Sequence, residues 1–581
     1  MITKYIKNTF VACSVCFCMT AVLTACSDNY MEEVNTDESK ATSIDPSAQL
    51  TTALLQTYGD FGLMDTYRSY ITGFTQHFAG GWNVSNYAGS VHANDDQMRL
   101  IWDQYYAVSI KNLVDAIYNS EDKPNTNAAL RIHRAYLMAV LTDTYGDLPC
   151  TEAGLGFIKN ISTPKYDTQE TIYDFIFDEL TKCSAQLGTG TDRIGGDVTS
   201  LNGDAAAWRK YANSLRLRYA MRISEVNPTK AQQEFEKALA DEGGYITEAS
   251  EDAYIIYTDG PFTLYDGSRD LDFRVNALGE ILYGQDPTSP TFVCSTLFNI
   301  LNNSNDPRLY RICRHYINTK RSEIKPDREW NVDVTDEVLA YLTSAGETEH
   351  PCDPGAAWWN NWVNAPANSA IPTLDKLVQQ YPEAGFDGSN YPARMMRPFL
   401  SIDFEMPDRP GTLITSAEVE FLLAEAKLNG WNVPGTIKDH FNAGIKASIK
   451  WMNEQYLNTT NSISDAEINT FVTSQATALS TNAKEAINTQ AWILHMMNPA
   501  EAWANLRRSD YPALRDRTML SKFESDFTYD DNNLQTPTRL CYPLLENKYN
   551  KANYTDALNR LGGKDDWHKR LWWDVKDINV K

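Results

Sequence analysis

The sequence predicts an all-α fold in which paired helices form the core and a long loop-rich segment interrupts them. Three observations lead to this prediction. Apolar residues recur at helical spacing in many segments. Residues that favour helix starts and helix stops flank several of these segments. Small residues such as Ala135, Ala139 and Ala212 lie on them and would let two helices pack closely.

The first helices come in neighbouring pairs. Segments 104–118 and 130–145 form one pair, and segments 168–187 and 204–224 form another. Asp167 and Glu170, three residues apart, resemble a capping box at the start of the third helix. Such pairs predict stacked hairpins of the tetratricopeptide type, in degenerate form, because no clean repeat of about 34 residues is visible.

Two further helices are expected later in the chain. Thr415 and Glu418 have the spacing of a capping box, and Gly430 follows the apolar residues of that helix. Segment 489–506 is the next helix. Trp503 on this segment and Trp208 on the earlier one are expected in the core.

The texture changes between about 245 and 410. Pro, Gly, Asn and Asp punctuate short segments there, and aromatic residues are dense. We predict a loop-rich insert at about 245–410 between two parts of a helical core, at about 46–240 and 411–510.

The N-terminus predicts a secreted lipoprotein. Lys4 and Lys7 precede an apolar run that has the length of a signal-peptide core and is too short to span a bilayer. The residues before Cys26 are small, as in a bacterial lipobox. We therefore expect a signal peptide at 1–25, a lipidated Cys26 with a flexible acidic tether at 26–45, and one large domain at 46–581.

Charge and cysteine content exclude several classes of protein. The formal net charge is −24, so the body is not expected to bind nucleic acid. The cysteines beyond Cys26 are scattered without metal-ligand spacing. Most of them are expected to be small buried apolar residues rather than parts of a disulfide framework.

The sequence lacks the common enzyme and cofactor signatures. It contains no zinc-protease helix motif, no nucleophile elbow, no Walker loop and no dinucleotide-binding glycine motif. His77 and His92 are far apart in sequence, and a lone histidine is usually structural. The acidic run 530–533 fits a solvated turn better than a calcium loop. The expectation is a non-catalytic protein without metal or cofactor.

Aromatic residues in loops are the candidate binding residues. Trp358, Trp359 and Trp362 lie among Asn, Pro and Gly without helical continuation. Trp82 follows a Gly-Gly turn, and Tyr87 lies nearby. Flat sugar faces stack on indole rings, and neighbouring Asn and Asp side chains can bind hydroxyl groups. The alternative, open for each ring, is that it anchors a loop to the core.

Several sequence blocks, together with the lipobox and acidic tether, resemble the SusD/RagB outer-membrane lipoproteins of Bacteroidetes. These blocks are TYGDLP at 144–149, KYDTQETIY at 165–173, LNGD at 201–204, WRKYANSLRLR at 208–218, TSAEVEFLLAEA at 415–426, EAWANLRR at 501–508 and RLWWD at 570–574. They occur in order over nearly the whole chain beyond the leader.

The resemblance implies a fold, a location and a partner. It implies a helical core of tetratricopeptide-like hairpins with a loop-rich, ligand-facing part. It implies a lipid-anchored protein that faces outward from the outer membrane, captures an oligosaccharide or a peptide, and delivers it to a SusC-like TonB-dependent barrel. Two other classes stay open on the residues alone, which are a glycoside hydrolase with an aromatic cleft and a helical scaffold that binds only protein.

Overall fold

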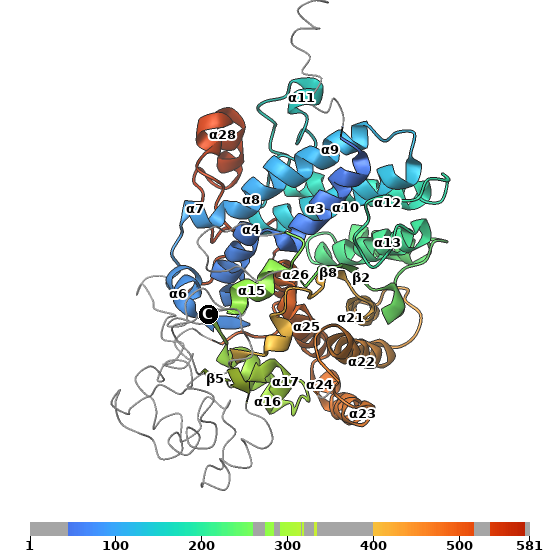
Figure 1. Cartoon of the computed structure of the whole chain (residues 1–581), viewed down its shortest axis with the longest axis vertical. Coiled ribbons are helices and arrows are strands. Elements are labelled where there is room, and N and C mark those ends of the chain that lie inside the picture. The colour runs from blue at the N-terminus through green and yellow to red at the C-terminus, as the bar shows by residue number, and fades with distance from the viewer. Residues whose placement is uncertain are drawn as a thin grey trace, which may run out of the picture. The chain divides into compact units, whose positions relative to one another are not determined.

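The computed structural model describes residues 44–259, 273–283, 291–314, 316–318, 331–333, 399–459, 461–515 and 535–575. Residues 46–581 form one structural unit. Most of the described elements are helices, so the prediction of an all-α core is confirmed (Figure 1). Among the described helices, none combines the length and the apolar character needed to cross a bilayer.

An array of helices runs from residue 46 to residue 239. Its α-helices are α3 (Pro46–Gly59), α4 (Phe61–Thr66), α5 (Thr72–Phe74), α6 (Gly81–Val84), α7 (Asp95–Met98), α8 (Leu100–Gln104), α9 (Lys111–Tyr118), α10 (Pro124–Tyr145), α11 (Gly156–Lys159), α12 (Gln169–Gln186), α13 (Ala205–Arg222) and α14 (Pro228–Leu239). Three π-helical turns interrupt it, which are η1 (Tyr67–Ile71), η2 (Ser85–Gly89) and η3 (Tyr105–Ile110). Helix α10 packs against α9 and α12, α12 packs against α13, and α13 packs against α14. The predicted pairing of neighbouring helices is therefore confirmed.

A second group of helices follows the insert. The described helices of the insert are η4 (Ala249–Glu251), α15 (Ala277–Tyr283), α16 (Ser295–Asn303), α17 (Leu309–Ile312) and η7 (Ile402–Phe404). The helices of the second group are α21 (Ser416–Leu428), α22 (Ile437–Gln455), α23 (Asp465–Ser474), α24 (Ala476–Thr481), α25 (Ala483–Leu494), η8 (His495–Met497), α26 (Pro499–Ser509), α27 (Glu546–Tyr549) and α28 (Lys551–Arg560). Helices α21 and α22 form a hairpin, and α21 also contacts α13. The two groups of helices thus share one core.

Strands are few and short in the described residues. They are β1 (Phe78–Gly80), β2 (Ala253–Ile255), β3 (Thr291–Val293), β4 (Cys313–Arg314), β5 (Tyr316–Asn318), β6 (Asn331–Asp333), β7 (Phe399–Leu400) and β8 (Gly411–Ile414). They pair antiparallel as β1 with β3, β2 with β8, β4 with β7 and β5 with β6. Most of these pairs join the insert to itself or to the helical groups.

The helix starts refine two of the sequence expectations. The N-cap of α12 is Thr168, whose hydroxyl accepts from the backbone N–H of Thr171, whereas Asp167 accepts from Thr151 N at 2.8 Å. Thr415 caps α21 as expected, but Glu418 points away from the cap and pairs with Arg218. The expected capping box at α21 is therefore only half formed, because the buried arginine competes for the carboxylate.

Two expected helices are interrupted. Segment 489–506 is not one helix, because α25 ends at Leu494 and a 3-10 turn precedes Pro499. Proline has no amide hydrogen and fits the first turn of a new helix, α26. Segment 104–118 contains the π-helical turn η3, which sequence periodicity does not reveal.

Helix α10 ends at a glycine that its surroundings require. Gly146 has φ +91°, a backbone conformation that favours glycine, and a Cβ atom there would lie 3.3 Å from Leu571 Cδ2. Asp147 then accepts from the backbone N–H of Gln169 at 2.8 Å. The Tyr145-Gly146-Asp147 block therefore turns the chain toward α12.

The core contains the tryptophans expected there. Trp208, Trp503 and Trp573 are fully buried. Trp573 Nε1 donates to Asp143 Oδ1 at 2.8 Å, so residues after α28 return to the end of α10. The free cysteines agree with the sequence interpretation, since four are buried and one is half-buried; these are Cys150, Cys183, Cys294, Cys313 and, half-buried, Cys541.

Candidate functional site

The Trp82 segment is held by a short strand and a glycine. Strand β1 pairs with β3, with Phe78 opposite Val293 and Gly80 opposite Thr291. Gly80 has φ +73°, and α6 starts at the next residue. The expected glycine turn is present, and it places the backbone of Trp82 on α6 directly after the strand.

Polar side chains from four short helical elements, α4, η1, α6 and α7, meet beside this segment. Asp65 on α4 forms an ion pair with Arg68 on η1. Gln97 Nε2, from α7, donates to Asp65 Oδ2 at 3.1 Å. Asn83 Nδ2, from α6, lies 3.3 Å from Asp65 Oδ1 and 3.3 Å from Ser69 Oγ. We refer to Asp65, Arg68, Ser69, Asn83 and Gln97 as the Asp65 cluster.

Tyr87 on η2 lies against the same cluster. Its ring centroid is 5.4 Å from that of Tyr70 on η1. Burial, and after it the negative charge of Asp65, raise the pKa of the Tyr87 phenol, while Arg68 opposes the shift. The phenol therefore remains protonated at neutral pH and keeps its O–H donor.

The cluster combines a buried floor with half-buried edges. Arg68 is 3% exposed, whereas Asp65, Asn83 and Gln97 are half-buried. Amide and carboxylate groups at such an edge can exchange hydrogen bonds with the hydroxyl groups of a ligand. Two of the supporting elements, η1 and η2, are π-helical turns, which occur frequently at functional sites.

The structure brings together part of the predicted site. Trp82 and Tyr87 belong to one short segment, from α6 to η2. The side chain of Trp82 lies outside the described residues, as do Trp358, Trp359, Trp362, Cys26 and the acidic run 530–533. The assignment of these tryptophans to ligand binding, of Cys26 to lipidation and of 530–533 to a solvated turn therefore stays a prediction.

Sequence reasoning did not identify Asp65, Arg68 or Gln97. The signal for the first two is an acid and a base three residues apart on one helix face. In a chain with 76 acidic residues this spacing is common and does not single out a site. Asn83 directly follows Trp82, but no pattern in the sequence singles it out.

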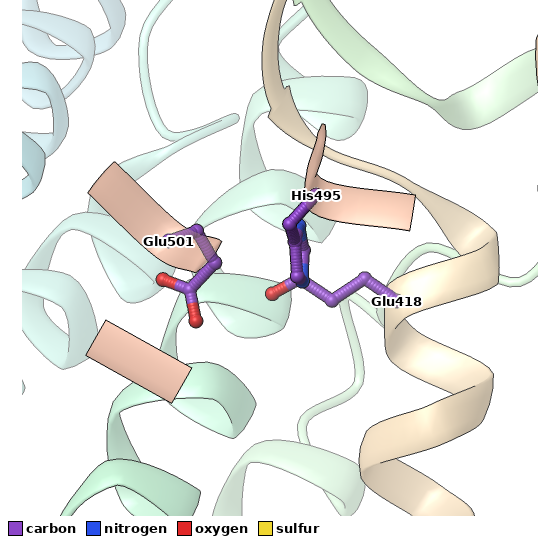
Figure 2. Close-up of side chains that lie close together, drawn as sticks. All are labelled: Glu418, His495 and Glu501. Carbon is purple, nitrogen blue, oxygen red and sulfur yellow. The ribbon is translucent and has the colours of Figure 1, made fainter. Parts of the chain in front are cut away.

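A second cluster of titratable groups lies deep in the core. Figure 2 shows Glu418 on α21, His495 at the start of η8 and Glu501 on α26 close together. One ligand atom from each lies within 4.8 Å of the others, so the three have the geometry of a metal site. His495 Nε2 is 3.9 Å from Glu418 Oε2.

Arginines already occupy these carboxylates. Arg218 donates to both oxygens of Glu418, at 2.5 and 2.7 Å. Arg222 Nη2 donates to both oxygens of Glu501, at 2.6 Å each. Burial lowers the pKa of His495, against the opposing pull of Glu418 and Glu501, so the imidazole is neutral. A cation here would have to displace two buried guanidinium groups, so we interpret the trio as part of a structural ion network.

The network extends to other helices of the core. Arg222 Nε lies 3.3 Å from Asp143 Oδ2 on α10. Arg508 on α26 forms two hydrogen bonds of 2.7 Å with Glu425 on α21. We call these pairs, with Glu418, His495 and Glu501, the core ion network. It joins α10, α13, α21 and α26.

Family models match two separate parts of the chain. One, described as starch-binding associating with outer membrane (SusD-like), matches residues 38–327. Another, described as SusD and RagB outer membrane lipoprotein, matches residues 387–574. No curated protein matches the sequence.

Solved structures match over most of the chain. A SusD-like protein of Bacteroidetes is 38% identical, with a TM-score of 0.78, and the match covers 92% of this chain and 100% of that one. A chitin-binding protein is 29% identical, with a TM-score of 0.69 and the same coverage. A SusD homolog from Bacteroides uniformis is 22% identical, with a TM-score of 0.65 and the same coverage, and this likeness concerns the fold alone.

Proposed function

Because the chain belongs to the SusD/RagB family of outer-membrane lipoproteins, we propose that it binds glycans at the cell surface without transforming them. The observation that carries this proposal is the Asp65 cluster beside the Trp82 segment. Its half-buried amide and carboxylate groups suit sugar hydroxyls, and Tyr87 adds a phenol donor. An indole at Trp82 would supply a stacking face.

The likeness to a chitin-binding protein indicates which glycans to test first. That protein is 29% identical over almost the whole chain, so oligomers of N-acetylglucosamine are the first ligand class. Maltohexaose is the second, since one matching family is described as starch-binding. Peptide ligands remain the alternative that the resemblance implies.

Calorimetric titration of the mature protein with chitohexaose and maltohexaose tests the ligand. We expect one of them to bind, and Trp82→Ala to weaken binding by about 1–3 kcal/mol, as for one buried aromatic contact. Trp358→Ala, Trp359→Ala and Trp362→Ala test the other predicted rings. Tyr118→Ala is the matched control, because Tyr118 is 62% exposed at the end of α9, away from the Asp65 cluster. Unchanged affinity in all four tryptophan variants would show that the site is elsewhere.

Delivery to a transporter is the second part of the proposal. We propose that a lipid on Cys26 anchors the protein and that it passes its ligand to a SusC-like TonB-dependent barrel. A mild-detergent pull-down of the tagged, lipidated protein from its native membrane should recover such a barrel in near-equal amount. A Cys26→Ser variant should lose membrane attachment. Recovery of the protein alone, with the barrel present in the membrane, would contradict delivery.

The absence of catalysis is proposed on the same basis. The carboxylates of the core ion network pair with arginines and are buried, so they are not placed to act on a glycan. We expect no release of reducing sugar when the purified protein is incubated with a glycan that it binds. Measurable turnover that is lost in Asp65→Asn would support the hydrolase alternative.

A further inference from the structure

A pocket outside the proposed glycan site lies between three segments of the fold. Its volume is about 260 Å³, and its walls come from α8 and η3, from the connection around α11, and from α27 with the residue that follows it. In Figure 1, α11 and α28 lie on the opposite side of α8 from α6. The Trp82 segment on α6 does not line this pocket.

The walls and rim of the pocket are aromatic. Trp102 and Tyr106 line it, with ring centroids 4.8 Å apart. Phe157 on α11 is 93% exposed and Tyr549 on α27 is 63% exposed, and both belong to the lining. Large apolar side chains gathered around a concavity at the surface mark sites of interaction with another molecule. Phe157 lies on a one-turn helix and contributes little to the core of this chain.

The lining of the pocket includes polar groups that have no hydrogen-bond partner within the described part of the chain, among them one oxygen of Glu546. Glu546 Oε2 accepts from the Tyr166 hydroxyl at 2.8 Å and from Asn550 Nδ2 at 3.4 Å. The Tyr106 hydroxyl donates to the carbonyl of Pro149 at 2.5 Å. Among the described residues, Glu546 Oε1 has no donor. The pocket therefore combines aromatic walls with a carboxylate oxygen of Glu546 that can accept from a donor on an incoming aromatic ring.

Exposed lysines lie on the segments around the pocket although the chain is strongly acidic. Lys111 lines the pocket, and Lys159, Lys548 and Lys551 lie within two residues of lining residues. None of the four forms an ion pair with a described residue, and Lys548 Nζ lies 4.9 Å from the centroid of the Tyr549 ring. The formal net charge of the whole chain is −24, so a cluster of unpaired lysines is a local exception. Such a rim attracts an acidic partner and disfavours a basic one.

We propose that this pocket binds a protein segment in which a tyrosine or tryptophan is flanked by acidic residues. The ring enters between Phe157 and Tyr549 and donates to Glu546, while the acidic neighbours face the lysines. A membrane would meet protruding side chains rather than a concave pocket. The proposal does not depend on glycan binding at the Asp65 cluster.

A capped heptapeptide, Gly-Asp-Glu-Trp-Glu-Asp-Gly, is the probe. We expect the mature protein to bind it in calorimetric titration with a Kd below about 1 mM. Tyr549→Ser should weaken binding roughly tenfold, as for an aromatic residue at the centre of an interface. Tyr118→Ser is the matched control, because it makes the same substitution at a tyrosine that is 62% exposed and does not line the pocket. Both positions are exposed, so neither substitution threatens folding.

Two further peptides separate the ring from the charges. Replacing Trp by Ala in the probe should abolish measurable binding, and replacing its acidic residues by Lys should weaken binding at least tenfold. Raising the salt concentration should weaken the acidic probe, since the lysines are exposed to solvent. The Trp82→Ala variant should bind the probe as tightly as the unmodified protein does. This separates failure of the peptide proposal from failure of the proposed glycan site.

Several outcomes would overturn the proposal. One is the absence of binding at about 1 mM probe, and another is an equal effect of Tyr549→Ser and Tyr118→Ser. If Tyr549→Ser abolishes chitohexaose binding while the peptide does not bind, the pocket is a glycan site. If Phe157→Ser reduces association of the unlipidated protein with phosphatidylethanolamine–phosphatidylglycerol vesicles and the peptide does not bind, it is a membrane contact.

Discussion

The Asp65 cluster and the core ion network are built from the same residue types but differ in what surrounds them. Asp65 and Arg68 lie on short helical segments and share their hydrogen bonds with the amides of Asn83 and Gln97. In the network, Glu418 and Glu501 lie on longer helices, and arginines take both oxygens of each carboxylate. A buried acid–base pair whose carboxylate oxygens all accept from arginines belongs to the scaffold. A pair whose neighbours are half-buried amides can still form hydrogen bonds with a ligand.

Breaking the network should give the largest effect on stability. In Glu501→Ala, Arg222 loses its strongest partner while it stays buried, and we expect the free energy of unfolding to fall by about 3–5 kcal/mol. Urea titration followed by circular dichroism measures this change. Asp178→Ala is the control, since it removes a surface ion pair with Lys182 and should cost less than about 1 kcal/mol. Similar losses in the two variants would remove the distinction between enclosed and exposed pairs.

Acid should lower the stability of the core before it weakens ligand binding at the proposed glycan site. Burial lowers the pKa of His77 to about 3 and that of His133 to about 4, from 6.5, so both are neutral in the folded protein. Below pH 6.5 the unfolded chain takes up protons that the folded protein does not, so stability falls as the pH falls. Between pH 7 and pH 5 each group should cost about 2 kcal/mol.

Unfolding titrations at the two pH values test this cost. His77→Gln should reduce the pH dependence of the free energy of unfolding by about 2 kcal/mol. Glycan affinity, measured in the same buffers, should change little as long as the protein stays folded. A stability that is level from pH 7 to pH 5 would show that these histidines are not buried as neutral groups.

The smallest effect is expected at the edge of the Asp65 cluster. Asn83→Ala removes an amide that contacts Asp65 and Ser69, and glycan affinity should fall by about 0.5–1.5 kcal/mol, the net worth of one hydrogen bond. The free energy of unfolding should change by less than about 0.5 kcal/mol. Asn119→Ala serves as control, because that exposed amide bonds only within α9. A stability loss without an affinity loss would place Asn83 in the scaffold.

The helical architecture could be predicted from sequence because its signals are local. Apolar spacing and start signals locate α12, α13 and α21 to within a few residues. The interruption at Pro499 and the π-helical turn η3 were missed, since one depends on the placement of a helix start and the other on packing.

The site was harder to predict because its parts are distant or ambiguous in sequence. The glycines and the tryptophan after β1 indicated that this segment is a candidate site. No local sequence pattern links Gln97 to Asp65, because the two residues are 32 positions apart. The blocks that carry the family resemblance explain the difference. They contain Arg218, Glu418, Glu501 and Arg508, which meet in the core ion network, so they report on the scaffold rather than on the ligand.

Asp143, near the end of α10, also bears on the order in which the chain can fold. It accepts from the Tyr173 hydroxyl at 2.6 Å and from Trp573, 430 residues later in the chain. The carbonyl oxygen of Thr144 likewise accepts from the backbone N–H of Leu540, and that of Tyr145 accepts from Arg539 Nε. Leu540, Arg539 and Trp573 are synthesised last, so the end of α10 receives these three donors only after nearly the whole chain has been made. The last hydrogen bonds at the end of α10 therefore form only when the C-terminal segment packs against it.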